Sequence, residues 1–432
     1  MKINVSKNLK ELSDIFSANG HPLYIVGGYV RNALLGFCET DIDLCGTATP
    51  QEVALFVPAN LYTVEMVNKK LGTLHLHSKL NSEVYEYTTF RAENYPKNGE
   101  HSPQSVEFVL DIRQDAKRRD FSANAIYYDI KNDQILDFYD GVKDTRAHIL
   151  RTVETPEFVF SSDGLRMLRL VRIASELGFK IDKKCFLVAK SMIANLQTIS
   201  RERFNKEIVS ILYADYKYPS VNAVDGHICG LKNLTDLQAW QFVFKQLYTT
   251  NNLLCEVPKG KWFSLVAKAP ASYRLSCFAI DFLNAVGLKI DQQNIALVLG
   301  EFGLGINKKE VCRQTQIILG FLDVCGGFAN VDQKRLFVQH HIDHIDEIVG
   351  IAELNNGASD LKMLKNIMLI DKVPLKLKDL KINGDVLMQK FPDLPKTKYS
   401  EILNHLLTVC CIAPELNNKN SLVQIVKKYT KQ

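Results

Sequence analysis

The first part of the chain alternates short apolar runs with polar turns, a pattern typical of strands and helices packed in an α/β domain. Residues 23–26 (LYIV) are predicted to form a strand and residues 29–35 a short helix, with a Gly-Gly turn between them. A second strand is expected directly afterwards, over the segment that carries Asp41 and Asp43. The pattern therefore predicts that a β-sheet begins near the N-terminus.

The alternation continues along the following segments. Residues 72–77 (GTLHLH) and 83–90 (EVYEYTTF) are predicted to form an antiparallel pair of strands. Residues 105–110 and a hairpin over residues 125–140 are expected to extend the same sheet. Residues 91–105 are polar, contain two prolines and one glycine, and show no periodicity, which predicts a long loop of the kind that is often functional.

Strand signals fade after about residue 155, and helical spacing replaces them. Residues 162–177 (SDGLRMLRLVRIASEL) are predicted to form an amphipathic helix, with Ser162 or Asp163 as its N-cap and Gly178 at its end. The remainder reads as successive helices, interrupted near Pro219, Gly230, Pro258, Pro270, Gly305, Gly326 and Pro374. The predicted fold class is α+β, with a head of mixed β-sheet and helices followed by an all-helical remainder.

Composition and charge narrow the class of protein only slightly. With 432 residues, 46% hydrophobic and 23% charged, the chain has the composition of an ordinary globular protein of several compact units. The sequence holds no signal-peptide pattern and no long apolar run, and its ten cysteines show no CxxC spacing, which favours reduced thiols in the cytoplasm. A net charge of +5 permits a polyanionic partner without requiring one.

Asp41 and Asp43 are the strongest candidates for chemistry. Residues two apart on a strand point to the same face, so the two carboxylates are expected to converge and to hold a cation such as Mg²⁺. The preceding turn, Gly27-Gly28, offers unhindered backbone N–H groups ahead of a helix, which favours a phosphate. Either pattern alone is common without function, but together they suggest nucleotidyl or phosphoryl transfer.

Two arginine-rich segments can bind a nucleotide or be ordinary surface. Residues 117–125 (KRRDFSANA) place arginines suited to phosphate oxygens just before a strand. In the helix over residues 162–177, one broad face carries Asp163, Arg166, Arg169 and Arg172. A carboxylate accepts from an exocyclic amino group while a guanidinium donates to the neighbouring ring acceptor, so Asp163 with Arg166 would select cytosine and adenine over uracil and guanine. The alternative is a solvated or salt-bridged face.

Other polar clusters have weaker functional readings. Residues 340–346 (HHIDHID) resemble a metal cluster, but in a helix His341 would turn away from His340 and His344, so a polar helix face is favoured. Lysines near the C-terminus are expected to be solvated or to contact RNA phosphates. They are Lys376, Lys378, Lys381, Lys427, Lys428 and Lys431.

Several of these segments, in order, resemble the class II tRNA nucleotidyltransferases, which include the CCA-adding enzymes and bacterial poly(A) polymerases. The resemblance covers roughly residues 22–210, and two C-terminal segments look like the tail of the Gram-positive CCA-adding type. The matching segments are VGGYVRNALLG with DIDL, TTFRAENYP with HSPQSVEFV, KRRDFSANAIYYD, FYDGVKD with ILRT, SDGLRMLRLVRIASELGF, ISRERFNKEI, LKINGDVLMQKF and APELNNKNSLVQIVKKY.

The resemblance implies a nucleotidyltransferase head at 1–150, a neck with the nucleotide-selecting helix at 151–214, a body at 215–325 and a tRNA-binding tail at 326–432. It implies addition of C, C and A to the tRNA 3′ end from CTP and ATP, with no protein partner and no membrane. Asp41 and Asp43 would be the catalytic residues and Mg²⁺ ligands. Nucleotide-binding positions would be Gly28, Arg31, Arg119, Asp163, Arg166, Arg169 and Arg172, with Asp163 and Arg166 reading the base.

The chain departs from the family pattern at a few positions. Asn32 replaces an aspartate, which bears on the orientation of Arg31. Ser162 and Gly164 replace Glu and Pro at the start of the selecting helix. In the 91–105 loop, which the family needs for adding the final A, Glu100 and Ser102 replace Arg and Pro.

Narrower relatives remain as alternatives: a CC-adding enzyme, an A-adding enzyme or a poly(A) polymerase. The full length of the 91–105 loop argues against CC addition alone, and the INGDVL segment argues against a poly(A) polymerase. A non-catalytic RNA-binding protein on the same fold is the alternative from another class.

Overall fold

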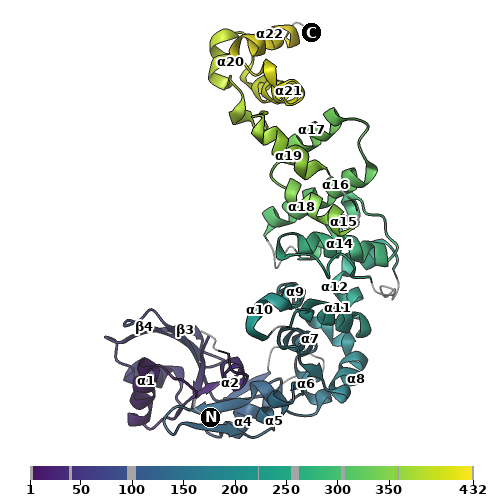
Figure 1. Ribbon diagram of the computed structural model, residues 1–432. Helices are drawn as coiled ribbons and strands as arrows, with labels where there is room; N and C mark the ends of the chain where they lie inside the picture. The colour runs from purple at the N-terminus through teal and green to yellow at the C-terminus, as the bar shows by residue number, and fades with distance from the viewer. Residues whose placement is uncertain are drawn as a thin grey trace. The chain divides into compact units, whose positions relative to one another are not determined.

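The computed structural model describes residues 3–37, 41–94, 104–221, 223–253, 262–302, 307–355, 357 and 360–430. The chain forms two compact units, Met1–Val257 and Pro258–Gln432 (Figure 1). The first unit holds all the strands and thirteen helices among its described residues, and the second is helical throughout its described part. This arrangement confirms the predicted α+β class with a mixed-sheet head and a helical remainder, whereas the finer division into head, neck, body and tail stays a prediction.

The elements of the first unit begin with α1 (Lys7–Ala18), β1 (Leu23–Val26), α2 (Gly28–Leu34), β2 (Asp43–Gly46), α3 (Pro50–Phe56), β3 (Tyr62–Asn68), β4 (Thr73–Ser78), β5 (Val84–Thr89), β6 (Arg91–Asn94), β7 (Ser105–Phe108), α4 (Ile112–Lys117), β8 (Ile126–Asp129), β9 (Gln134–Asp137), α5 (Gly141–Arg146) and β10 (Ile149–Leu150). They continue with α6 (Pro156–Ser162), α7 (Leu165–Leu177), β11 (Lys180–Ile181), α8 (Lys183–Ser191), α9 (Arg201–Leu212), α10 (Ala214–Lys217), α11 (Gly226–Asp236), α12 (Trp240–Val243) and α13 (Lys245–Thr250).

The second unit contains α14 (Arg274–Ala285), α15 (Gln292–Phe302), α16 (Lys308–Gly326), α17 (Val331–His340), α18 (Ile345–Leu354), α19 (Leu361–Ile370), α20 (Gly384–Lys390), α21 (Tyr399–Ile412) and α22 (Lys419–Tyr429). None of the described helices is long and apolar enough to cross a membrane. The eight described cysteines are free thiols.

The head is built on one seven-stranded mixed sheet with strand order β3-β4-β5-β2-β1-β8-β9. Strands β2 and β5 are parallel, and the other neighbouring pairs are antiparallel. One face is apolar and packs on α1 and α3, because alternate residues of each strand, such as Leu74, Leu76 and Tyr87, point to it. The strand β2 therefore lies in the middle of the sheet, held by hydrogen bonds along both edges.

The strands β5, β8 and β9 lie within the segments predicted from alternation, and β4 extends one residue beyond its predicted segment, residues 72–77. The strand β3 was not predicted. The prediction for residues 105–110 was wrong in its partner, since β7 pairs with β6 in a separate two-stranded ribbon. Arg91–Asn94 is likewise strand rather than loop, because backbone pairing with β7 satisfies its polar groups without any apolar alternation. The rest of that predicted loop, residues 95–103, lies outside the described residues.

Several predicted helix boundaries also need correction. Ser162 closes α6 instead of capping the next helix, and Gly230 lies inside α11 rather than at a break. A Cβ at Gly230 would come within 2.7 Å of the Ser175 hydroxyl oxygen and still closer to Ile211, so this glycine allows close packing of helices. Gly178 does end α7, in the left-handed conformation with φ 65°. The predicted breaks at Pro258 and Gly305 lie outside the described residues.

Candidate functional site

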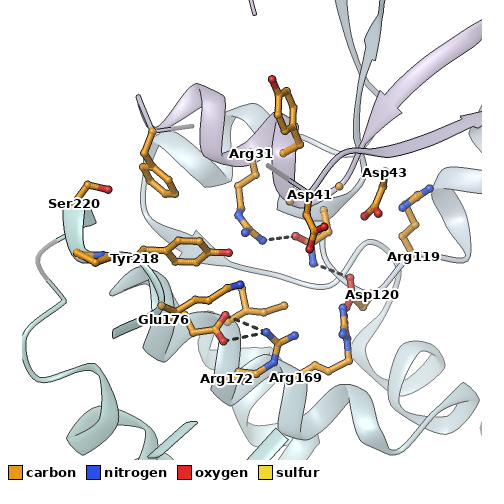
Figure 2. Close-up of a pocket in the computed structure, with 18 residues that line it drawn as sticks. Arg31, Asp41, Asp43, Arg119, Asp120, Arg169, Arg172, Glu176, Tyr218 and Ser220 are labelled. Atoms are coloured by element: carbon orange, nitrogen blue, oxygen red, sulfur yellow. Dashed lines mark hydrogen bonds and ion pairs between the residues drawn. The ribbon is translucent and has the colours of Figure 1, made fainter. Parts of the chain in front are cut away.

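A polar cavity of about 620 Å³ lies in the first unit, between the head sheet and the helix α7 (Figure 2). Its walls come from the turn after β1, the start of β2, the segment after α4, the helix α7 and residues 217–220. Seven of the nine predicted site residues line it: Gly28, Arg31, Asp41, Asp43, Arg119, Arg169 and Arg172. Its volume is that of an ordinary small-ligand pocket, and its side chains are mainly charged.

The two aspartates face the cavity at the start of β2. Asp43 is the first residue of this strand and pairs with Val26 of β1 and Glu86 of β5. Asp41 precedes the strand, so the prediction that both residues lie on one strand was wrong for Asp41. Both carboxylates are nevertheless solvent-exposed and line the same cavity, an oxygen donor set that suits a hard divalent cation.

Gly27 leaves room beside Asp43. Its φ of 80° lies in the left-handed region, where a Cβ is strained, and a Cβ there would lie 3.5 Å from Oδ2 of Asp43. This glycine turns the chain sharply from β1 into α2 and keeps the carboxylate accessible.

Arg31 belongs to a chain of hydrogen bonds that links α2 to α7. Its Nε donates to Oδ1 of Asn32 (2.9 Å) and its Nη1 to Oδ1 of Asn124 (2.6 Å). Asn124 Nδ2 donates to Asp120 Oδ1 (3.0 Å), and Arg169 Nε donates to Asp120 Oδ2 (2.8 Å). The chain fixes both arginines at the cavity wall, as Figure 2 shows.

Asp120 is the carboxylate at the centre of this chain. Burial alone would raise its pKa, but Arg169 and Arg166 outweigh burial and hold the pKa well below its usual range. The same interaction raises the pKa of Arg169. Both groups are therefore charged at neutral pH, and Asp120 orients Arg169 without any ligand.

Arg119 is held in a second ion-pair cluster. Its Nη2 lies 3.1 Å from Asp115 Oδ2, and its Nε donates to the hydroxyl of Tyr127 (2.9 Å). Asp115 also pairs with Arg118 at 2.7 Å. Burial would raise the pKa of Asp115, but Arg118 and Arg119 lower it to about 2. The guanidinium of Arg119 is thus fixed beside the aspartate pair, where a phosphate would need it.

Arg172 is fixed on the other side of the cavity by two glutamates. Its Nε donates to Glu207 Oε2 (2.6 Å), and its Nη1 donates to Glu176 Oε2 (3.0 Å). Burial raises the pKa of Glu176, although Arg172 opposes that rise. Arg172 and Glu176 together present a donor and an acceptor on one turn of α7, a pair able to hydrogen-bond a base edge.

Asp163 and Arg166, the predicted base-reading pair, do not line this cavity. Asp163 Oδ1 accepts from the backbone N–H of Leu165 (2.9 Å), and Arg203 Nη2 donates to its Oδ2 (2.9 Å). Arg166 donates to the carbonyl of Arg118 (2.7 Å) and to Ser162 Oγ (3.0 Å). The two side chains act here as contacts between α7 and its neighbours, and their base-reading role stays a prediction.

Sequence reasoning missed several residues of the cavity wall, among them Asn124, Glu176, Lys217 and Tyr218. Glu176 could have been found, because it lies four residues after Arg172 on the same helix face. Lys217 and Tyr218 come from the end of α10, which no pattern connected with the head. Tyr218 lies with its ring centroid 5.3 Å from that of Phe37, so two aromatic rings border the cavity.

The histidine cluster at residues 340–346 is not a helix face, which corrects that prediction. His340 ends α17, residues 341–344 form a turn, and Ile345 begins α18. Burial and the neighbouring His340 lower the pKa of His341 to about 4, and Asp343 pairs with Lys376. Within the described ranges, no three side chains of this segment come together as metal ligands.

Comparisons with known proteins give consistent findings. A family model described as the poly A polymerase head domain matches residues 23–151. The CCA-adding enzyme of Ligilactobacillus salivarius is 29% identical over 416 residues, which cover 95% of this chain and 93% of that protein. The CCA-adding enzyme of Staphylococcus aureus (strain Newman) is 28% identical over 386 residues, 86% of this chain and 84% of that protein.

Two solved structures share the fold. The Bacillus stearothermophilus CCA-adding enzyme in complex with CTP superposes with a TM-score of 0.71 at 22% identity, covering 99% of this chain and 98% of that one. The Thermotoga maritima CCA-adding enzyme complexed with tRNA gives a TM-score of 0.59 at 18% identity, covering 98% and 96%. The architecture is therefore shared over nearly the whole length of each chain.

Proposed function

Because the chain belongs to the class II tRNA nucleotidyltransferases, the family of the CCA-adding enzymes, we propose that it adds C, C and A to the 3′ end of tRNA from CTP and ATP. Pyrophosphate is the other product. The observation that carries this proposal is the single cavity at which two carboxylates, Asp41 and Asp43, meet arginines from three separate elements. The similarity to CCA-adding enzymes along most of the chain supports the choice of acceptor and nucleotides.

Nucleotidyltransferases of this family use a divalent metal ion, and the donor set here fits one. We propose that Asp41 and Asp43 hold it and that it is Mg²⁺, since two carboxylates beside a triphosphate suit this ion. When bound, it would neutralise phosphate charge and favour ionisation of the attacking hydroxyl. The space left by Gly27 beside Asp43 Oδ2 supports this use of the carboxylate.

The arginines would bind and orient the nucleotide. Arg119 and Arg31, on either side of the aspartates, are proposed to contact the triphosphate together with the backbone at Gly28. Because Asp115 and Asn124 already fix these guanidinium groups, little side-chain order has to be created on binding. In-line attack by the tRNA 3′-hydroxyl on the α-phosphorus would then form the new phosphodiester and release pyrophosphate.

The helix α7 is proposed to select the base. Arg169 and Arg172 line the cavity, and Asp163 with Arg166 would complement the amino-plus-acceptor edges of cytosine and adenine. The latter two residues would have to exchange their contacts with Arg203 and Arg118 for contacts with the base. The neck, body and tail would hold the tRNA, and the cytoplasm is the proposed compartment.

One assay tests this function against its narrower alternatives. The purified protein is incubated with Mg²⁺, CTP, ATP and a tRNA that ends before CCA, and the products are sized. Products longer by three residues, ending in A, are expected. Products that stop at CC would indicate a CC-adding enzyme, and long A tails a poly(A) polymerase. Extension of a tRNA already ending in CC, but not of one lacking CCA, would indicate an A-adding enzyme.

The proposed role of Asp41 and Asp43 is tested by substitution in the same assay. Asp43→Ala should abolish incorporation of both CTP and ATP, because the metal would lose one of its two protein ligands. Folding of the variant is checked by circular dichroism and by thermal unfolding. Retained activity in a folded variant would remove the pair from the metal site, and no extension by the unaltered protein would favour the non-catalytic alternative.

A further inference from the structure

A second cluster of metal-ligating side chains lies on the head sheet, outside the cavity described above. It consists of Glu65 on β3 with His75 and His77 on β4, and we call it the β4 cluster. Glu65 is paired directly with His75 in the antiparallel register, and His77 lies two residues further along β4. Directly paired residues and residues two apart point to the same face of a sheet, so all three side chains share one face.

The ligand atoms of the β4 cluster are already close together. Nε2 of His77 lies 2.7 Å from Oε2 of Glu65, and Nδ1 of His75 lies 3.6 Å from the same oxygen. One ligand atom from each residue lies within 4.8 Å of the others. Tetrahedral ligands of Zn²⁺, bonded at about 2.0–2.1 Å, lie roughly 3.4 Å apart. Small side-chain rotations would therefore bring the three atoms to bonding distance from one ion.

A fourth residue lies beside the second ring nitrogen of His75, where it can accept a hydrogen bond. Glu86 of β5 is paired directly with His75, and its Oε2 lies 3.7 Å from Nε2 of that imidazole. Since Nδ1 of His75 faces Glu65, a proton on Nε2 would face Glu86. Metal-binding histidines usually donate their second ring N–H to such an acceptor, which fixes the tautomer and the ring orientation.

The β4 cluster is accessible to an ion from solvent, and its strand is anchored in the core. The side chains of His75, His77 and Glu65 are 32%, 41% and 59% exposed, so an ion can enter and a water molecule can complete the coordination. On the opposite face of β4, Leu74 and Leu76 are fully buried in the head core. The buried face anchors the strand and hence the positions of both histidines.

We propose that Glu65, His75 and His77 bind a divalent transition-metal ion, with Zn²⁺ as the best fit, at a site separate from Asp41 and Asp43. Two imidazoles favour Zn²⁺ over Mg²⁺, which prefers oxygen ligands only. The two sites therefore select different ions by ligand type. They also share one face of the sheet, since Glu86 is paired with both His75 and Asp43 on its two sides. The bound ion would cross-link β3 to β4 at the edge of the sheet.

Calorimetric titration of the full-length protein with ZnCl₂, in buffer that contains millimolar Mg²⁺, tests this proposal. One zinc site is expected, whose Kd is weakened at least 100-fold by His77→Ala or His75→Ala. Glu86→Gln should weaken it about 10-fold, because it removes only the support of the ring. In parallel, Co²⁺ bound at this site should show no thiolate charge-transfer band, which excludes the cysteines as ligands.

A matched control removes two other adjacent imidazoles, His340 and His341, and should leave the zinc affinity unchanged. The substituted histidines of the β4 cluster are partly exposed, and thermal unfolding of the metal-free variants verifies that they fold. Absence of zinc binding, an affinity unchanged by His77→Ala, or loss of binding in the control would overturn the proposal and leave the β4 cluster as a surface ion-pair network. None of these outcomes depends on catalysis, so the proposed function is tested separately.

Discussion

Asn32 is buried and has an amide nitrogen, Nδ2, for which the described residues provide no hydrogen-bond partner. Its Oδ1 accepts from Nε of Arg31, so the amide cannot be reversed without losing that bond. The family pattern has an aspartate at this position, and a carboxylate would offer a second acceptor in place of the unsatisfied donor. Asn32 therefore holds Arg31 through one hydrogen bond, while its amide nitrogen is a buried unsatisfied donor, which costs stability.

Asn32→Asp should stabilise the protein by about 1 kcal/mol or more, because it removes a buried unsatisfied donor and adds a charge-assisted bond to Arg31. Denaturant unfolding at neutral pH measures the change. Asn124→Asp is the matched control with the opposite expectation, since Asn124 Nδ2 donates to Asp120 and a carboxylate there would repel it. Lower stability of Asn32→Asp would contradict this reading of the site.

Asp115 gives the fold a pH dependence whose sign follows from its pKa. The folded value of about 2 lies below the ordinary 3.8, so the stabilisation is complete above about pH 4 and is lost as pH falls towards 2. Asp115→Asn should lower stability by about 3–5 kcal/mol at pH 7, because Arg118 and Arg119 lose a buried partner. The deficit should shrink by about 1 kcal/mol between pH 6 and pH 3. Urea unfolding at the two pH values checks this, and a deficit independent of pH would contradict it.

The helix α7 shows what the sequence could and could not predict about an element. Its cationic face and its end at Gly178 were predicted from spacing alone, since these depend on neighbours within the helix, whereas its start was predicted too early. The sequence did not predict which end of that face borders the cavity. Asp163 accepts a hydrogen bond from Arg203 of α9, and Arg166 donates to the carbonyl of Arg118. Both partners are distant in sequence, and no local pattern predicts these contacts.

The base-reading role proposed for Asp163 and Arg166 can be tested by substitution. Asp163→Ala should relax nucleotide choice, lowering the ratio of kcat/KM for CTP over UTP by about 10-fold or more, because a base carbonyl would no longer face a carboxylate. Single-nucleotide incorporation with each of the four triphosphates measures this.

Arg203→Ala is the comparison for that variant. It removes the contact of Asp163 seen here but leaves the carboxylate in place, so selectivity should be retained. Continued exclusion of UTP and GTP by Asp163→Ala would show that the pair only joins helices, and would direct attention to Arg172 and Glu176.

The β6–β7 ribbon illustrates a second limit of sequence reading. Residues 91–94 contain charged side chains and no alternation, and their strand conformation depends on pairing with residues 105–108 across the intervening segment. Arg91 is additionally held by Glu93 and by the carbonyl of Leu71. A strand in a polar two-stranded ribbon has no buried face. It therefore lacks the alternation of apolar and polar residues from which strands are predicted.

For the molecule as a whole, the second unit offers a basic surface where the tail was predicted to meet RNA. A cavity of about 710 Å³ is lined by four lysines, Lys372, Lys376, Lys378 and Lys381, with Asp379 as the only acidic residue among its described lining. Such a concentration of positive charge is suited to a phosphate backbone. The surface belongs to a different unit from the cavity at Asp41 and Asp43, so the two proposed functions can be altered separately.

Replacing Lys376, Lys378 and Lys381 with alanine should raise the KM for tRNA about 10-fold at physiological salt and reduce the salt dependence of tRNA binding. The KM values for CTP and ATP should stay unchanged. Lys334→Ala with Lys365→Ala serves as the control, because these lysines lie in the same unit but are not among the residues that line this cavity. An equal effect of both sets would indicate only a general loss of charge.

The placement of Asp43 at the start of a central strand limits how this protein can evolve. Both edges of β2 are paired, with Val26 on one side and Glu86 on the other. A shift of one residue would turn Asp43 into the apolar core and leave Leu44 facing the cavity. Substitutions elsewhere in the head can accumulate one by one, but an insertion or deletion within β2 would remove the carboxylate proposed to hold the metal ion and the core packing together. Length changes in the gene should therefore be absent from this strand in any working relative, even where sequence identity is low.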